Sequence, residues 1–294
     1  MRRKFYTILR ANVKTLTIVP ENTRIVPLQP AGERPPFFMV DSFPCFIDVV
    51  KIIGADQPVL SLICQEETQT SDRYSIVDEA AAHVETILGH QPQGPYMLGG
   101  CSSSGIVAYE VAQQLRALGR EVGLLVMFDA PNPFFMREYS RFWMSVNSYR
   151  DDLSKLGWKE IPGWAAGKFW KLTSGESAWL RNDLNTAYGA SRSKDQFAPL
   201  SSRIDATRKY RPAPYAGRFL LVKRFRELTG RYLDSRFGWG EVVQGKFEIC
   251  RVNSIDHLEI FKSELDRALV AQALRRNFDE VIGASAGCLS ARVI

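Results

Sequence analysis

The chain has 294 residues and a net charge of +6; 45% of its residues are hydrophobic, 24% charged and 11% aromatic. These fractions are typical of a globular protein and exclude a disordered, fibrous or membrane-spanning class. No apolar run approaches the roughly 20 residues that a membrane helix needs. The length suffices for one large α/β domain with a sizeable core.

The N-terminal segment, residues 1–23, is basic, and it has neither the apolar stretch nor the small-residue cleavage site of a secretory signal. Five cysteines are scattered along the chain and form no C-x-x-C pair. Neither a disulfide framework nor a zinc site is therefore indicated, and a cytoplasmic location fits best. We expect no metal or other cofactor.

Positive charge gathers between Arg203 and Arg236, where ten Lys or Arg residues stand against three Asp or Glu. Such a segment is either an ordinary solvated face or a landing surface for an acidic partner. Because it contains no nucleic-acid-binding motif, nucleic acid is not an expected partner.

Short apolar, β-branched runs alternate with longer helical patterns, which predicts a mostly parallel sheet with helices on both faces. The expected strands are Arg24–Leu28, Pro36–Asp41, Val59–Cys64, Pro95–Gly100, Val122–Asp129, Arg218–Phe225 and Lys246–Val252. The expected helices are Cys45–Ile53, Ile76–Leu88, Ser103–Leu118 and Lys262–Ile282.

One segment, from about residue 131 to 214, interrupts the alternation and holds five of the six tryptophans. An aromatic insertion of this length after a central strand is predicted to lie over the carboxyl edge of the sheet, where open α/β sheets bind ligands. We therefore expect a domain over residues 24–282 with a helical lid at 131–214. A loose tail is expected at 283–294.

An apolar strand, a turn of very small residues and a helix follow one another around Ser102. In this context the motif G-x-S-x-G marks a nucleophile elbow, a tight turn that projects a serine hydroxyl over the sheet. Ser102 is favoured because Gly100 precedes it by two positions, although Ser104 stands where the second glycine is usual. Ser103, Cys101 and a helix cap without chemistry remain alternatives.

A serine nucleophile needs a base and an acid. In this arrangement the acid and then the histidine follow the nucleophile along the chain, which excludes His83 and His90 and leaves His257. Asp129 at the end of an apolar strand and Glu227 past the next strand compete as the acid. Asp129 is favoured because a carboxylate buried there needs a partner.

Together these features resemble the thioesterase domains of nonribosomal peptide and polyketide synthases, which have the α/β-hydrolase fold. The similarity runs from about Val26 to Ile282 and supports Asp129 as the acid, because in that family the acid follows the strand after the nucleophile helix. The motifs that carry it are Val26-Pro27-Leu28-Gln29-Pro30-Ala31-Gly32, Gln91-Pro92-Gln93-Gly94-Pro95-Tyr96-Met97-Leu98-Gly99-Gly100, Val107-Ala108-Tyr109-Glu110-Val111-Ala112 and Phe128-Asp129-Ala130-Pro131.

The resemblance implies a serine thioesterase. Ser102, deprotonated by His257, would attack an acyl, peptidyl or polyketide thioester on the phosphopantetheine arm of a partner carrier protein, and release would follow by hydrolysis or cyclisation. The N–H group of Ser103 and that of Ser42 or Phe43 would form the oxyanion hole. Typical carrier proteins are acidic, so the basic segment gains a plausible partner.

Some residues depart from the family pattern. The segment Asp41-Ser42-Phe43-Pro44 stands where the family usually carries a histidine, then proline or glycine, then two glycines. Pro44 has no N–H group to donate, and Asp41 would repel a developing oxyanion unless it faces away or is paired. Two other functions therefore stay open. One is an acyltransferase that passes the acyl group to an amine or hydroxyl; the other is an inactive carrier-binding protein.

Overall fold

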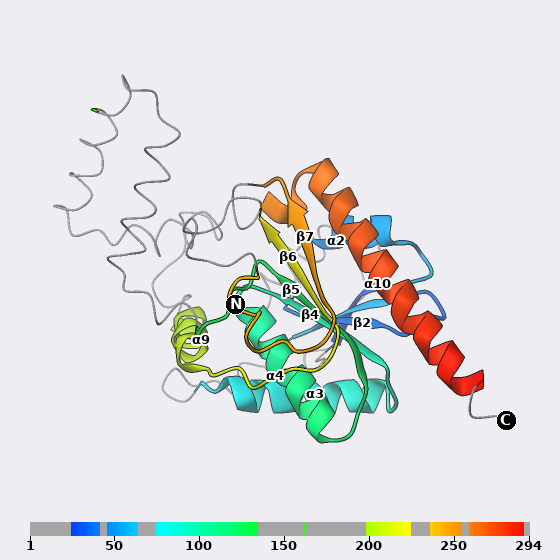
Figure 1. Cartoon of the computed structure of the whole chain (residues 1–294), viewed down its shortest axis with the longest axis horizontal. Coiled ribbons are helices and arrows are strands. Elements are labelled where there is room, and N and C mark those ends of the chain that lie inside the picture. Colours follow the sequence, from blue (N-terminus) through cyan, green and yellow to red (C-terminus); the bar gives the residue numbers. More distant parts are fainter. Residues whose placement is uncertain are drawn as a thin grey trace.

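The structure is a computed structural model that describes residues 25–41, 46–63, 74–134, 162, 198–224, 236–254 and 259–290. One seven-stranded sheet runs through it in the order β1-β3-β2-β4-β5-β6-β7 (Figure 1). The strands are β1 Ile25–Gln29, β2 Phe37–Val40, β3 Val59–Leu62, β4 Tyr96–Cys101, β5 Val122–Phe128, β6 Phe219–Arg224 and β7 Phe247–Val252. All the strands predicted from the sequence are confirmed, with small shifts at their ends.

Every strand pair is parallel except β1 with β3, which is antiparallel. The predicted α/β-hydrolase type of sheet, mostly parallel with helices on both faces, is therefore confirmed. Strand β2 shows why the central strands read as continuous apolar runs: all four of its residues, Phe37 to Val40, are buried. A parallel strand covered on both faces has no solvent-facing side to fill with polar residues.

Two helical layers cover the sheet (Figure 1). One face packs against α3 (Ile76–His90) and α4 (Ser103–Ala117), the other against α2 (Phe46–Ile53) and α10 (Glu264–Ser290). Alternate residues of β2 serve the two cores: Phe38 and Val40 join the α3/α4 side, and Phe37 and Met39 join the α2/α10 side. Successive side chains of a strand point to opposite faces of the sheet, so β2 contributes apolar side chains to each core in turn.

Two helices differ from the expectations. Helix α10 continues to Ser290, beyond the predicted end at Ile282, so it extends into the segment 283–294 that was predicted as a tail. Alanine and leucine in this stretch are good helix formers, and a helix that is already nucleated can extend through the glycines between them. Helix α9 (Ala198–Lys209) was not predicted as a separate helix and lies inside the segment predicted as a lid. The sequence of α9 is polar and shows little helical periodicity. Most of the segment 131–214 lies outside the described residues.

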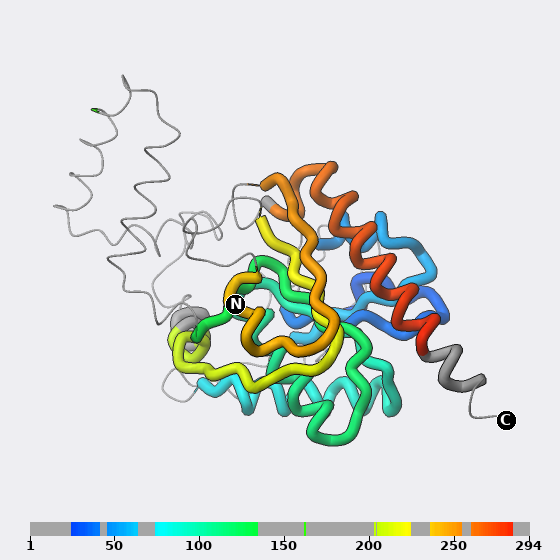
Figure 2. The backbone as a smooth tube through the Cα atoms, viewed as in Figure 1, coloured from blue at the N-terminus to red at the C-terminus, as the bar shows by residue number. Residues whose placement is uncertain are grey.

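Helix α9 and the chain that follows it lie along α3 and α4. Figure 2 shows the backbone leaving α9 and passing α4 on its way to β6. Hydrogen bonds fix this path: Tyr109 Oη donates to Ala213 O at 2.5 Å, and Gln113 Nε2 donates to the carbonyls of Ala213 and Pro214 at 3.0 and 3.1 Å. The end of the predicted lid is therefore attached to the helix that begins at the nucleophile turn.

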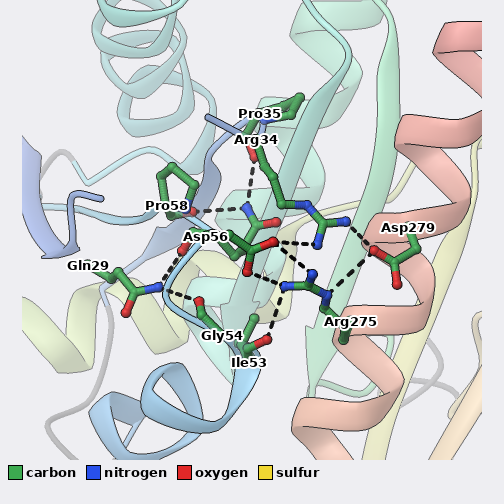
Figure 3. Close-up of polar contacts among 10 residues, drawn as sticks. Gln29, Arg34, Pro35, Ile53, Gly54, Asp56, Pro58, Arg275 and Asp279 are labelled. Carbon is green, nitrogen blue, oxygen red and sulfur yellow. Dashed lines mark hydrogen bonds and ion pairs between the residues drawn. The ribbon is translucent and has the colours of Figure 1, made fainter. Parts of the chain in front are cut away.

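Charged residues join α10 to the loops at the amino ends of β2 and β3 (Figure 3). Arg275 contacts Asp56 through two hydrogen bonds of 2.5 and 2.8 Å, and Arg34 lies between Asp56 and Asp279. Gly54 takes a φ of +123° beside this cluster, a conformation that favours glycine. These contacts lie at the amino ends of the strands, whereas Ser102 lies at the carboxyl ends.

None of the helices in the described ranges has the length and apolar character needed to cross a membrane.

Candidate active site

Three neighbouring strands, β2, β4 and β5, are each followed by a non-glycine residue with positive φ. These residues are Asp41 (44°), Ser102 (54°) and Asp129 (45°). The strands are parallel, so all three residues lie at the carboxyl edge of the sheet. Residues held in such strained conformations concentrate at functional sites. The two residues predicted as nucleophile and acid are therefore placed on adjacent strand ends.

Backbone hydrogen bonds hold these strand ends in place. Each residue donates its N–H group to the next strand: Asp41 to Leu62 O at 3.0 Å, Ser102 to Phe128 O at 3.0 Å and Asp129 to Val222 O at 2.7 Å. The sheet ladder therefore continues through the strained residues. Their conformations are fixed by the sheet rather than by a mobile loop.

The turn at Ser102 depends on small neighbours. Ser102 has φ 54° and ψ −125°, between the end of β4 and the start of α4. A Cβ atom on Gly100 would lie 2.3 Å from the carbonyl oxygen of Ser104, and one on Gly105 would lie 2.8 Å from Ala130 Cβ. Only glycine fits these positions without moving the backbone, which explains the glycines two positions before and three after Ser102.

The Ser102 side chain does not act as a helix cap, since it makes no capping hydrogen bond to the described first turn of α4. Ser75 at the start of α3 provides the contrast. It has extended backbone angles, φ −127° and ψ 127°, and its hydroxyl accepts a bond from the Asp78 N–H group at 3.3 Å. An N-cap normally has the geometry of Ser75. The conformation of Ser102 therefore favours the nucleophile interpretation over the cap interpretation.

The two rivals of Ser102 occupy less suitable positions. Cys101 is the last residue of β4 and is 1% exposed. Ser103 is the first residue of α4, so its backbone N–H group belongs to the first turn, which has no acceptor within the helix. That position suits the predicted oxyanion donor.

Ser42 and Phe43, predicted as alternative oxyanion donors, lie outside the described residues, as do His257 and Glu227. The N–H group of the preceding Asp41 is already bonded to Leu62 O, so Asp41 is not the donor.

Asp129 is held by a partner that the sequence interpretation missed. Its Oδ2 atom lies 2.6 Å from Nε of Arg224, and both side chains are nearly inaccessible to solvent. Arg224 is the last residue of β6, the strand that pairs with β5. A charged residue that ends a completely buried strand is the signal that could have identified it, because a buried charge needs a partner.

His83, excluded as the base by chain order, is buried on α3. Its Nε2 atom lies 3.5 Å from Oε1 of Glu79 on the same helix. His83 therefore belongs to the packing of α3 against its neighbours.

The two departures from the family pattern contact each other. Ser104 Oγ donates to Asp41 Oδ2 at 3.2 Å, and Arg203 of α9 forms an ion pair with the same Asp41 oxygen and donates to Ser104 Oγ at 3.1 Å. The condition set from the sequence, that Asp41 be paired, is met by Arg203.

Arg203 also reaches a second carboxylate. Its other terminal nitrogen pairs with Glu79, and its Nε donates to Tyr74 Oη at 3.0 Å. Burial alone would raise the pKa of Glu79, but the nearby Arg203 and His83 outweigh it and lower the pKa to about 2. Burial disfavours the charged guanidinium, yet Asp41 and Glu79 raise the pKa of Arg203 well above its usual value.

Within the described ranges, no group of three or more His, Cys, Asp or Glu residues is arranged to hold a metal ion.

Comparisons with known proteins agree with this geometry. Residues 55–143, which include the turn at Ser102 and the end of β5, match the thioesterase domain family. Sixty residues, 20% of the chain, are 52% identical to the non-reducing polyketide synthase CTB1 of Cercospora nicotianae. A dimodular nonribosomal peptide synthase of Bacillus subtilis is 37% identical over 116 residues, 37% of the chain. The chain spans only 3% and 5% of the lengths of these two synthases.

Solved structures show the same fold over most of the chain. The NocB thioesterase domain, in covalent complex with a fluorophosphonate nocardicin G analog, superposes with a TM-score of 0.62 at 20% identity and covers 86% of this chain and 98% of its own. The type II thioesterase BorB of the borrelidin cluster gives a TM-score of 0.58 at 14% identity and covers 89% and 98%. The chain has the α/β-hydrolase fold, and residues 55–143 are similar in sequence to the thioesterase domain family.

Proposed function

We propose that the chain is a serine thioesterase. It takes an acyl, peptidyl or polyketide chain from a phosphopantetheine arm onto Ser102 and releases it by hydrolysis or cyclisation. His257 serves as the base and Asp129 as the acid that orients it. The N–H group of Ser103 and that of Ser42 or Phe43 stabilise the tetrahedral intermediate.

The backbone of Ser102 is the observation that carries the proposal. A serine strained at φ 54° and ψ −125° between a central strand and a helix, with no capping role among the described residues, supports the interpretation as a nucleophile elbow. The carboxylate of Asp129 is buried at the end of the adjacent strand. There it could accept a hydrogen bond from the base, which is His257 in this proposal.

The acyl donor in this proposal is a carrier protein. Lys209 and Arg211, at the end of α9 and just after it, are exposed basic residues in the segment 203–236. Since typical carrier domains are acidic, charge complementarity supports docking near this end of the lid segment. The arm brings its thioester as substrate, and no further cofactor is required. A cytoplasmic location, inferred from the scattered cysteines, stays a prediction.

The test is the intact mass of the protein after exposure to an acyl-pantetheine thioester, with the acylated residue located by peptide mapping. The parent is compared with Ser102→Ala and His257→Ala. Ser75→Ala is the matched control, because it removes a hydroxyl from an ordinary helix cap. We expect one acyl unit on Ser102 or released product in the parent and the control, and neither in the other two variants.

The released species separates the two functions that share this triad. A free acid or a ring supports the thioesterase, whereas an amide or ester formed with an added amine or alcohol identifies an acyltransferase. Failure of the parent to acylate with short and long chains, together with failure to react with a fluorophosphonate, would identify an inactive carrier-binding protein.

A further inference from the structure

Arg203 gathers four polar side chains around one guanidinium. It pairs with Asp41 and Glu79, donates to Tyr74 Oη at 3.0 Å and donates to Ser104 Oγ at 3.1 Å. Tyr74 Oη in turn donates to Glu79. The side chain of Arg203 is only 12% exposed, so these bonds form largely away from water and are correspondingly strong.

Two of these partners belong to elements that flank Ser102. Asp41 directly follows β2 and precedes Ser42 and Phe43, the predicted oxyanion donors. Ser104 lies in the first turn of α4, two positions after Ser102, and is buried. A single side chain thus fixes both the strand end that leads to the oxyanion hole and the helix that leads away from the nucleophile.

The same contact decides the electrostatics of the turn. An unpaired Asp41 carboxylate would oppose the negative charge that develops on an oxyanion held by neighbouring N–H groups. The guanidinium of Arg203 compensates that charge and forms an ion pair that a lysine could not reproduce with the same fork of donors. The adjacent carboxylate of Glu79 has its own partners in Tyr74 and the other terminal nitrogen of Arg203.

We propose that Arg203 is a positioning residue for the reaction at Ser102: from α9 it neutralises Asp41 and fixes Ser104. The helix that ends the predicted lid therefore contributes a side chain that the nucleophile turn needs. This inference rests on the proposed function of Ser102 as nucleophile. It goes further by assigning a role to Arg203 that neither the family match nor the triad requires.

The experiment measures the second-order rate constant for labelling of Ser102 by a fluorophosphonate, and, separately, kcat and KM for an acyl-pantetheine thioester. We expect Arg203→Met to slow labelling by more than 10-fold and to lower kcat similarly, with KM changed by less than about 3-fold. Arg276→Met is the matched control, since Arg276 also pairs with a carboxylate but lies on α10. It should label at the parental rate.

The double variant Asp41→Asn/Arg203→Met separates electrostatic positioning from simple loss of structure. Removal of the stranded Asp41 charge should restore labelling to at least 5 times the rate of Arg203→Met, even though a further native contact is lost. The proposal would be overturned if the double variant labels as slowly as Arg203→Met and if the labelling rates of the variants fall in proportion to their Tm values. Should Arg203→Met not fold, Arg203→Gln, which also removes the charge but keeps a polar side chain, is compared with Asp41→Asn/Arg203→Gln under the same criterion.

The two readouts keep this inference apart from the proposed function. If the parent labels at Ser102 but does not turn over thioesters, the thioesterase proposal fails while the labelling rates still judge Arg203. If Arg203→Met labels as fast as a parent that does turn over thioesters, only the positioning role fails. If the parent neither labels nor turns over, both fall, because there is no activated serine to position.

Discussion

Arg224 Nε lies 2.6 Å from Asp129 Oδ2, and the two residues stand at the carboxyl ends of the paired strands β6 and β5. A carboxylate has two oxygens and can accept from more than one donor. The contact with Arg224 is therefore compatible with a hydrogen bond from a histidine to the same carboxylate. Because the pair is buried, removal of either charge has a large effect on the free energy of unfolding.

Asp129→Asn tests both roles of this carboxylate. It removes one charge of the buried ion pair with Arg224, which we expect to lower the free energy of unfolding by about 3–5 kcal/mol. If Asp129 orients the base, the rate of acylation at Ser102 should also fall, by about 10⁴-fold. Urea unfolding and fluorophosphonate labelling measure the two effects. Asp48→Asn is the control, because Asp48 pairs with Lys51 on the surface of α2.

The double variant Asp129→Asn/Arg224→Met separates stability from chemistry. Removal of the second charge of the buried pair should recover much of the lost stability, while labelling stays as slow as in Asp129→Asn. Recovery of labelling along with stability would show that Asp129 matters only through the fold.

Gly100→Ala tests the packing of the nucleophile turn. The added Cβ atom would lie 2.3 Å from the Ser104 carbonyl oxygen, closer than such atoms approach in folded proteins. We expect the free energy of unfolding to fall by about 3 kcal/mol or more, with labelling of Ser102 reduced in the folded fraction. Urea titration and labelling at a temperature well below Tm provide the measurements.

Gly89→Ala is the matched control for this substitution. Gly89 lies in α3, and a Cβ atom there meets nothing within 4 Å. Alanine should therefore leave the stability unchanged or raise it by up to about 1 kcal/mol. Equal losses in the two variants would contradict the steric explanation of Gly100.

The sequence predicts the sheet well because its strands are buried on both faces. Continuous apolar runs such as Phe37–Val40 and Val122–Phe128 leave little room for another interpretation. Helix α9 is harder to predict from the sequence, because the residues from Ala198 to Lys209 are largely polar and form no apolar stripe. Its contacts with α3 and α4 are tertiary, so local periodicity does not reveal them.

The parts of the site that depend on neighbouring residues in the sequence can be predicted, whereas the contacts between residues far apart in the sequence cannot. The small residues around Ser102 identify the turn, since the strain of an elbow selects them. The pairing of Asp41 with Arg203 joins positions 162 residues apart, and that of Asp129 with Arg224 joins two strand ends. Neither pair has a spacing rule that a single sequence reveals, although the need of each buried charge for a partner is foreseeable.

Glu79 should make the protein sensitive to acid. The ordinary pKa of 4.5 is lowered to about 2 in the folded chain, where Arg203, Tyr74 and His83 face the carboxylate. A carboxylate whose pKa is lower in the folded than in the unfolded state stabilises the folded protein at pH values above the unfolded-state pKa. That stabilisation is lost as the pH falls from about 5 toward 2. The expected loss is on the order of 3 kcal/mol.

Glu79→Gln isolates this effect. The variant should be less stable than the parent at pH 7, and the difference in the free energy of unfolding should shrink as the pH falls to 3. The comparison cancels Asp56 and Glu280, whose pKa values are also lowered to about 2, because both proteins contain them. A difference that stays constant from pH 7 to 3 would contradict the assignment.

Arg275→Met tests whether the ionic contact at the amino edge of the sheet serves stability alone. Arg275 binds Asp56 with two hydrogen bonds, and this raises the pKa of Arg275 and holds that of Asp56 at about 2. Because the pair is exposed, water and salt screen it, so we expect only a small fall in Tm, smaller still at 1 M salt. Labelling of Ser102, at the opposite edge, should not change. A slower labelling reaction in a variant with parental Tm would mean that α10 transmits the state of this edge to the active site.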